Sequence, residues 1–191
     1  MNNSDYVVSE EKDYILSCAT LLGQSGFPKA AFIKMVGNEF ASDIFDLINN
    51  GQLIMNATII TYPLRDKRKK RINSDAQMRF YHGMMSELTA FVSTYFDSIN
   101  LPFTINESNS MNMRLPTPLD VDSNIDNPSV ECSNKYHRNK GKYLCESLIR
   151  SVNKLPLSQT DVNNTFWLLG WYYTILGKTD EANVAFRRIL R

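Results

Sequence analysis

Cysteine and histidine are scarce in this chain of 191 residues, which contains three Cys and two His. Three cysteines cannot form a fully paired disulfide framework, and their number favours a reducing compartment. Cys132, His137 and Cys145 lack the closely spaced ligand pairs that a zinc site usually has. We therefore expect no metal site and no cofactor.

Catalytic motifs and long apolar runs are also missing. The chain has no Gly-rich phosphate loop, no Gly-x-Ser-x-Gly and no His-Glu-x-x-His, so we expect a protein that is not an enzyme. No stretch approaches the roughly 18 consecutive apolar residues that span a membrane. The first residues, MNNSDYVVSEEKD, are polar and acidic, unlike a secretory signal. These features predict a cytoplasmic protein without a membrane span.

An overall excess of charge is absent, with 21 Lys and Arg against 20 Asp and Glu, but the charges are unevenly distributed. The net charge is −4 over residues 1–64, +5 over 65–71, −6 over 72–134 and +6 over 135–191. The near-neutral total excludes a uniformly basic nucleic-acid coat. The asymmetry permits either local attraction to an acidic partner or an arrangement in which acidic and basic segments of the chain face each other.

The basic run RDKRKKR is the densest cluster of charge. It could contact nucleic-acid phosphates, anionic lipid or an acidic protein surface, or it could be a solvated loop. No aromatic residue interleaves it, so we expect no base stacking there. Its candidate contact residues are Arg65, Lys67, Arg68, Lys69, Lys70 and Arg71.

The first sixty residues predict three helices and a β element. Apolar residues recur at three- and four-residue intervals over 10–24, 28–36 and 40–50, and Gly, Pro and Asn separate the three segments. In the third segment the apolar stripe includes Phe45. The following stretch, 52–64, is rich in β-branched residues, which predicts a strand or a hairpin.

Three short helices followed by a β-ribbon and a basic tip resemble a winged helix over residues 10–71. In that resemblance the second and third helices form the helix-turn-helix, and 52–71 forms the wing. Recognition helices place Arg, Lys, Asn or Gln toward base edges, whereas the third helix here carries Asp43 and Asp46 and no basic residue. The order of the elements thus implies a DNA-binding regulator, and the chemistry of this helix opposes it.

The strongest helical signal covers residues 74–99. Ser74 and Gln77 fit a capping box, and the apolar seam that follows repeats every three or four residues. The seam consists of Met78, Tyr81, Met85, Leu88, Val92, Tyr95 and Ile99. Two interpretations remain open, a central core helix on which the others pack and a helix that forms a homodimer.

A polar segment separates two predicted domains. Residues 103–139 are dense in Asn, Ser, Asp and Pro, and predict a linker or loop. They divide an N-terminal helical domain, 1–102, from a C-terminal helical region, 140–191. The expected fold class is therefore mainly α, with helical hairpins around a long central helix and one short strand or hairpin near 52–64.

Six residues near the C-terminus resemble a tetratricopeptide repeat (TPR). Phe166, Leu169, Gly170, Tyr173, Ala182 and Phe186 match the offsets Trp-x2-Leu-Gly-x2-Tyr and Ala-x3-Phe, with Phe166 in place of Trp. Such a pattern predicts two crossed helices that approach at Gly170 and Ala182. A single repeat cannot bury its own apolar face, so it needs further packing partners.

Trp167, Trp171 and Tyr172 add rings to the same hairpin, more than one face can bury, so some of them should contact the N-terminal part of the chain or another protein. With Tyr173 they are the predicted protein-binding residues, and the TPR resemblance implies binding to other proteins. The sequence therefore predicts a non-enzymatic interaction module, such as an adaptor, a chaperone-like protein or a regulatory factor. The alternative is a winged-helix-type DNA-binding transcriptional regulator with a C-terminal TPR-like region that senses a partner.

Overall fold

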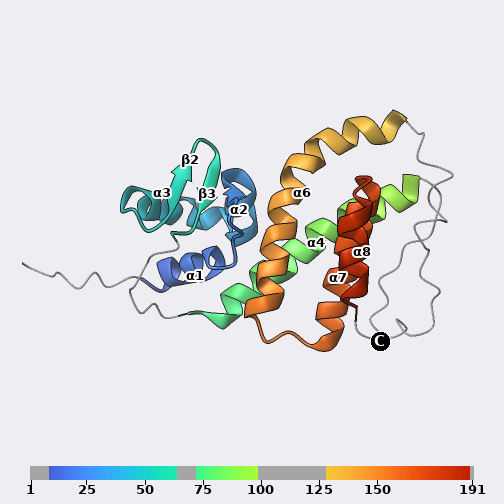
Figure 1. Ribbon diagram of the computed structural model, residues 1–191. Coiled ribbons are helices and arrows are strands. Elements are labelled where there is room, and N and C mark those ends of the chain that lie inside the picture. The colour runs from blue at the N-terminus through green and yellow to red at the C-terminus, as the bar shows by residue number, and fades with distance from the viewer. Residues whose placement is uncertain (1–8, 64–71, 99–127, 190–191) are drawn as a thin grey trace, which may run out of the picture. The chain divides into compact units, whose positions relative to one another are not determined.

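The computed structural model describes residues 9–63, 72–98 and 128–189, which are mainly helical with one small sheet (Figure 1). This confirms the predicted fold class. The chain divides into two compact units: an N-terminal unit, Met1–Met84 with Tyr143–Leu155, and a C-terminal unit, Met85–Lys142 with Pro156–Arg191. One boundary lies inside α4 (Ser74–Ser98), between Met84 and Met85, and a second lies inside α6 (Pro128–Lys154), between Lys142 and Tyr143.

The first helix, α1 (Glu10–Ala19), begins at a side-chain cap. The Ser9 hydroxyl accepts a hydrogen bond from the Lys12 N–H at 3.3 Å, and acidic residues in the first turn suit the helix dipole. The helix is shorter than the predicted 10–24. Its apolar pattern continues through a tighter turn, in which Leu21 and Leu22 are still buried, and therefore the pattern extends beyond the helix.

The second and third predicted helices are confirmed. Helix α2 (Lys29–Val36) ends at Gly37, whose φ of 131° favours glycine. A short 3₁₀ helix, η1 (Asn38–Phe40), leads into α3 (Ala41–Asn49). The two α-helices lie between the first and second strands in chain order.

The sheet has three short antiparallel strands in the order β1-β3-β2. They are β1 (Phe27–Pro28), β2 (Ile54–Asn56) and β3 (Ile59–Thr61). Strands β2 and β3 form a hairpin, which decides between the two predicted forms of 52–64. Ile60 of the central strand pairs with residues of both neighbours and is buried. The sequence did not predict β1, because two residues carry no periodicity.

Aromatic packing joins the sheet and helices of the N-terminal unit. The Phe80 ring of α4 lies 5.9 Å from that of Phe27 and 5.6 Å from that of Phe32. All three side chains are buried. Such tilted and edge-on ring pairs stabilise by about 0.5–1.5 kcal/mol beyond the burial of their area.

Helix α6 corrects the predicted linker. It begins at Pro128, whereas the sequence placed the linker over 103–139 and a helix from 140. Pro suits a first helical turn because its missing N–H is not needed there, and no Pro or Gly interrupts the chain before Gly141. The polar composition of this first part concealed its helical structure from an analysis based on apolar periodicity.

The C-terminal unit contains the predicted helical hairpin, α7 (Gln159–Ile175) and α8 (Thr179–Arg187). The Ser158 hydroxyl caps α7, and Gly177 turns the chain with a φ of 69°. A β-carbon built on Gly170 would lie 2.5 Å from Cε1 of Phe186, so the two helices are close at this glycine.

The apolar seam of α4 is largely covered within the single chain. Tyr81, Leu88, Val92 and Tyr95 are buried, and Ile99 lies outside the described residues. A second copy is therefore not needed to bury the seam, which removes the reason for expecting a homodimer. Among residues 9–63, 72–98 and 128–189, no helix combines the length and apolar character needed to cross a bilayer.

Candidate protein-contact surfaces

Two of the predicted protein-binding rings are buried. Trp171 has none of its surface exposed and Tyr172 has 2 %, so neither presents a surface to a partner. Trp167 and Tyr173 are half-buried. The sequence interpretation of a fully aromatic contact face on the hairpin is corrected in this respect.

Aromatic rings of α4 pack against the aromatic side chains that the α7–α8 hairpin cannot bury alone. Trp171 packs edge-on against Phe96 at 5.0 Å and against Phe186 at 5.8 Å. Tyr172 meets Phe91 at 5.3 Å. The expectation that some of the surplus rings contact the N-terminal part, 1–102, is met by Phe91 and Phe96 of α4.

The predicted repeat-packing residues gather in this core. Phe166, Leu169, Gly170 and Ala182 are buried, and Phe186 packs at Gly170. The guanidinium of Arg188 lies 5.2 Å from the centre of the Phe166 ring. These residues stabilise the hairpin, as the repeat-like spacing predicts.

The basic run lies outside the described residues, so the structure gives no geometry for Arg65 to Arg71. The hairpin turn, however, is described. It falls at Ala57 and Thr58, between β2 and β3, with Ala57 at a φ of 54°. The turn itself is uncharged, and the basic run follows β3 in the chain. The wing over 52–71 stays a prediction, because its basic residues lie outside the described residues.

Three exposed apolar side chains mark a surface that the sequence analysis missed. Phe45 on α3 is 43 % exposed, and Ile54 and Met55 on β2 are 42 % and 37 % exposed. We call these three residues the α3–β2 surface. The sequence placed Phe45 in the buried stripe, but Ile44 and Leu47 form that stripe. Because Phe45 lies one residue beyond Ile44 on the helix, it points about 100° away from it.

Lys29 connects the two elements of this surface. Its Nζ lies 4.9 Å from the centre of the Phe45 ring, and its N–H donates to the Thr58 carbonyl, in the turn after β2, at 2.7 Å. Phe45 and the turn of the β-hairpin are thus both next to Lys29. Ile54 and Met55 are consecutive strand residues, so their side chains point to opposite faces of the sheet.

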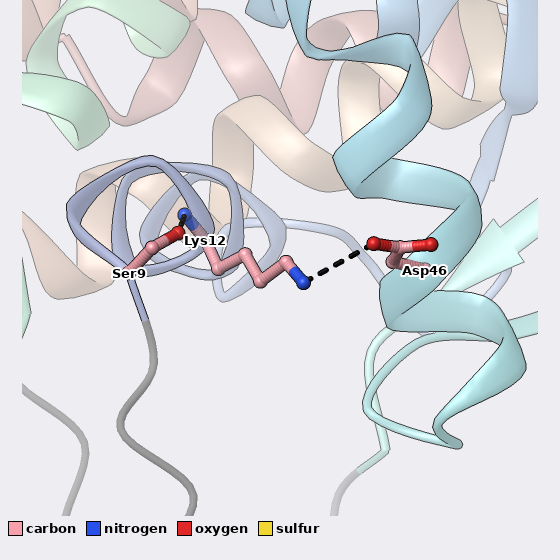
Figure 2. A network of polar contacts seen from close by, with 3 residues as sticks. All are labelled: Ser9, Lys12 and Asp46. Carbon is pink, nitrogen blue, oxygen red and sulfur yellow. Dashed lines mark hydrogen bonds and ion pairs between the residues drawn. The ribbon is translucent and has the colours of Figure 1, made fainter.

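The charge on α3 is acidic. Neither α3 nor the β2–β3 hairpin contains a Lys or Arg. Asp46 accepts a hydrogen bond and ion pair from Lys12 of α1 at 3.3 Å (Figure 2). The same Lys12 supplies the N–H that Ser9 caps, so the start of α1 and the middle of α3 are joined through one residue.

The thiol of Cys18 is buried and has low reactivity. Burial raises its pKa to about 12, and its Sγ lies 3.5 Å from the Ala76 carbonyl, to which it donates. A thiol that keeps its proton is a poor nucleophile and a poor metal ligand. Within the part of the chain that the structure describes, no group of three His, Cys, Asp or Glu could hold a metal ion.

Among the described residues, the large apolar side chains that are exposed are Phe45, Ile54, Met55, Ile72 and Val184, and the largest rings of the α7–α8 hairpin are buried. The only predicted contact residues that the structure leaves half-buried are Trp167 and Tyr173. Comparisons with protein-family models, with curated proteins and with solved structures found no match for this chain.

Proposed function

We propose that this protein is a non-enzymatic protein–protein interaction module, an adaptor, chaperone-like or regulatory factor, which binds its partner through the α3–β2 surface. The observation that carries the proposal is the joint exposure of Phe45, Ile54 and Met55. Single exposed apolar residues are common on any protein. Here three such residues are exposed on α3 and β2, two elements that contain no Lys or Arg, which favours contact with a protein rather than with a phosphate backbone.

The energetics suit a protein interface of moderate strength. Complete burial of one such side chain contributes about 1.5–3 kcal/mol, and these three are already partly covered, so each contributes less. Phe and Met are enriched at the centres of interfaces, where charged residues are depleted. The TPR-like hairpin α7–α8 serves in this proposal mainly as a packed support, with a secondary contact at Trp167 and Tyr173.

The test compares Phe45→Ser/Met55→Ser with Val184→Ser in the full chain. Val184 is a matched control, because it is 56 % exposed but lies on α8. Affinity purification from the native cell, with nuclease, should recover a protein partner with the original chain and with Val184→Ser, and lose it with the double variant. Circular dichroism should confirm that all three are folded. Retention of the partner by the folded double variant would contradict the proposal.

A DNA-binding regulator is the second candidate, and the order of the elements favours it. The sequence α1-β1-α2-α3-β2-β3, with the sheet order β1-β3-β2, resembles a winged helix. The acidic α3 opposes it, since a carboxylate near a phosphate backbone costs Coulomb energy.

The two functions separate in one binding experiment on the full chain. A DNA regulator should bind duplex DNA with a steep salt dependence, and this binding should be lost when Lys67, Arg68, Lys69, Lys70 and Arg71 are changed to Gln. An interaction module should keep its protein partner through that change. Absence of duplex binding by the original chain at low salt would exclude the regulator, and binding that the Gln variant preserves would exclude the basic run as its contact.

A further inference from the structure

A row of polar side chains on α6 binds the main chain of the loop that follows α1, both in the N-terminal unit. Glu146 accepts two hydrogen bonds from Ser25, from its N–H at 3.0 Å and from its hydroxyl at 2.9 Å. The neighbouring Ser147 hydroxyl accepts from the Gly23 N–H at 3.2 Å. This end of the loop therefore presents its donors to acceptors on α6.

The other end of the loop presents its carbonyls to cations. Arg150 Nη1 donates to the Leu22 carbonyl and Lys154 Nζ donates to the Thr20 carbonyl, both at 2.9 Å. Glu146, Arg150 and Lys154 are four residues apart, so they lie along one face of α6. Because α1 has no basic residue in its last turn, the two cations of α6 also suit the negative end of the α1 dipole.

The centre of this face is small and polar rather than apolar. Ser147 and Ser151 are completely buried, and the Ser151 hydroxyl donates to the Ser147 carbonyl at 2.8 Å. The buried apolar side chains of this segment are Leu144, Leu148 and Leu155, with the Cys145 thiol, and Tyr143, Ile149 and Val152 are half-buried. Hydrogen bonds to the main chain are replaced by water on separation, so each contributes only about 0.5–1.5 kcal/mol, or somewhat more when charged.

We propose that Tyr143–Leu155 is a polar strap on the loop of residues 20–25. The strap detaches from this loop in a local opening, while the rest of the protein stays folded. The hydrogen bonds between the strap and the loop, above all those that Ser25 donates to the Glu146 carboxylate, determine how often the strap opens. Opening frees the Gly23 and Ser25 N–H groups and exposes Cys145, which is 1 % exposed when the strap is closed. The loop leads into β1 through Gly26, the residue before the strand, where an added β-carbon would meet the Ile60 carbonyl, so the strap also controls the sheet edge.

The strap makes a specific prediction for the unmodified full chain. Alkylation of Cys145, followed by peptide mass spectrometry, should occur through an opening with a weaker urea dependence than global unfolding, because less surface is exposed. Amide exchange at Gly23 and Ser25 should show the same weak dependence, whereas buried amides of α2 and α3 should follow global unfolding.

A pair of variants tests the role of the carboxylate. Glu146→Gln keeps the shape and removes the charge that strengthens its hydrogen bonds, so Cys145 alkylation and Ser25 exchange should accelerate roughly fivefold to tenfold. Lys142→Gln is the control, since it removes a charge from an exposed position of the same helix. If Glu146→Gln leaves both rates unchanged, or if Cys145 in the unmodified chain reacts only with the urea dependence of global unfolding, the strap does not exist.

Discussion

The contact that α6 makes in the N-terminal unit and the contact between α7 and α8 in the C-terminal unit depend on different chemistry. In the N-terminal unit, α6 is attached largely by side chains that bind main-chain groups, with small hydroxyls at the centre of the contact. In the C-terminal unit, aromatic rings pack at glycines, as Phe186 does at Gly170 and Tyr172 at Gly141. The first kind of contact can exchange its bonds with water, and the second depends on close fit.

This difference between the two kinds of contact indicates where each unit tolerates amino-acid substitutions. Hydrogen bonds to the main chain depend little on the identity of the loop side chains. The exceptions are Gly23, where a β-carbon would lie 2.5 Å from the Glu146 Cβ, and Ser25, whose hydroxyl also donates to Glu146. Ring packing depends on every atom involved, since interiors are filled as densely as organic crystals. We therefore expect the largest effects of substitution in the C-terminal unit.

The largest effect is expected from Trp171→Ala. Trp171 contacts Phe96, Phe186 and Trp167, and removing its ring should lower the free energy of unfolding by about 3–5 kcal/mol. Chemical denaturation measures the loss, and amide exchange should place it mainly in α7 and α8. Trp171→Phe should cost much less, because it keeps a ring and removes an indole N–H that has no hydrogen-bond partner among the described residues. Equal losses for the two would show that the ring packing is not decisive.

High pH should weaken the N-terminal unit through Cys18. Its pKa of about 12 when folded lies above the reference value of 9.0, so between these values the unfolded chain has released a proton that the native state retains. The free energy of unfolding should therefore fall as pH rises, by about 3 kcal/mol from pH 8 to pH 11.

Two variants isolate this contribution in urea titrations at both pH values. The stability gap between the original chain and Cys18→Ala should narrow at pH 11, because the variant lacks the titrating thiol. Leu16→Ala removes a buried side chain of the same helix that does not titrate, so its gap should be the same at both pH values. A gap for Cys18→Ala that does not change with pH would contradict the buried neutral thiol.

A glycine pair sharpens the comparison further. Gly170→Ala introduces a methyl group against the Phe186 ring and should destabilise by about 1–3 kcal/mol. Gly83→Ala is the matched control within α4, where no atom lies within 4 Å of the added carbon, and it should stabilise by up to about 1 kcal/mol through helix propensity. Thermal unfolding should shift in opposite directions for the two variants. A shift in the same direction would mean that Phe186 moves aside without cost.

The smallest effect is expected at the surface ion pair. Asp46→Asn removes the partner of Lys12 and should cost only about 0.2–1 kcal/mol, since the carboxylate is exposed. The difference from the original chain should shrink at high salt, where exposed charges are screened. Urea titrations at two salt concentrations measure it, and a salt-independent loss would point to packing rather than charge.

Local signals made most of the helices predictable. Ser9 and Ser158 are caps, Gly177 is a turn, and the apolar spacing of α2, α3 and α4 identified their positions. These features act over a few residues, so the sequence alone contains them. The TPR-like spacing of the C-terminal residues also predicted that two helices come close at Gly170.

Contacts between distant residues were not predictable in the same way. Glu146 and Ser25 are 121 residues apart, and nothing in either segment indicates the other. The burial of Trp171 depends on rings of α4, and the two-residue strand β1 exists only because β3 pairs with it. For the candidate site, the exposure of Phe45 follows from which side of α3 faces its unit, and short apolar runs do not settle that choice.

The strap residues Tyr143–Leu155 belong to the unit that begins the chain, although more than half of the sequence separates them from α1. Neither unit is therefore a single contiguous stretch. A truncation after residue 102 would delete Glu146, Arg150 and Lys154, and leave the carbonyls and amides of the α1 loop to solvent. Deletion mapping of the partner site would then confuse loss of folding with loss of binding, so point substitutions in the intact chain are the sound way to locate it.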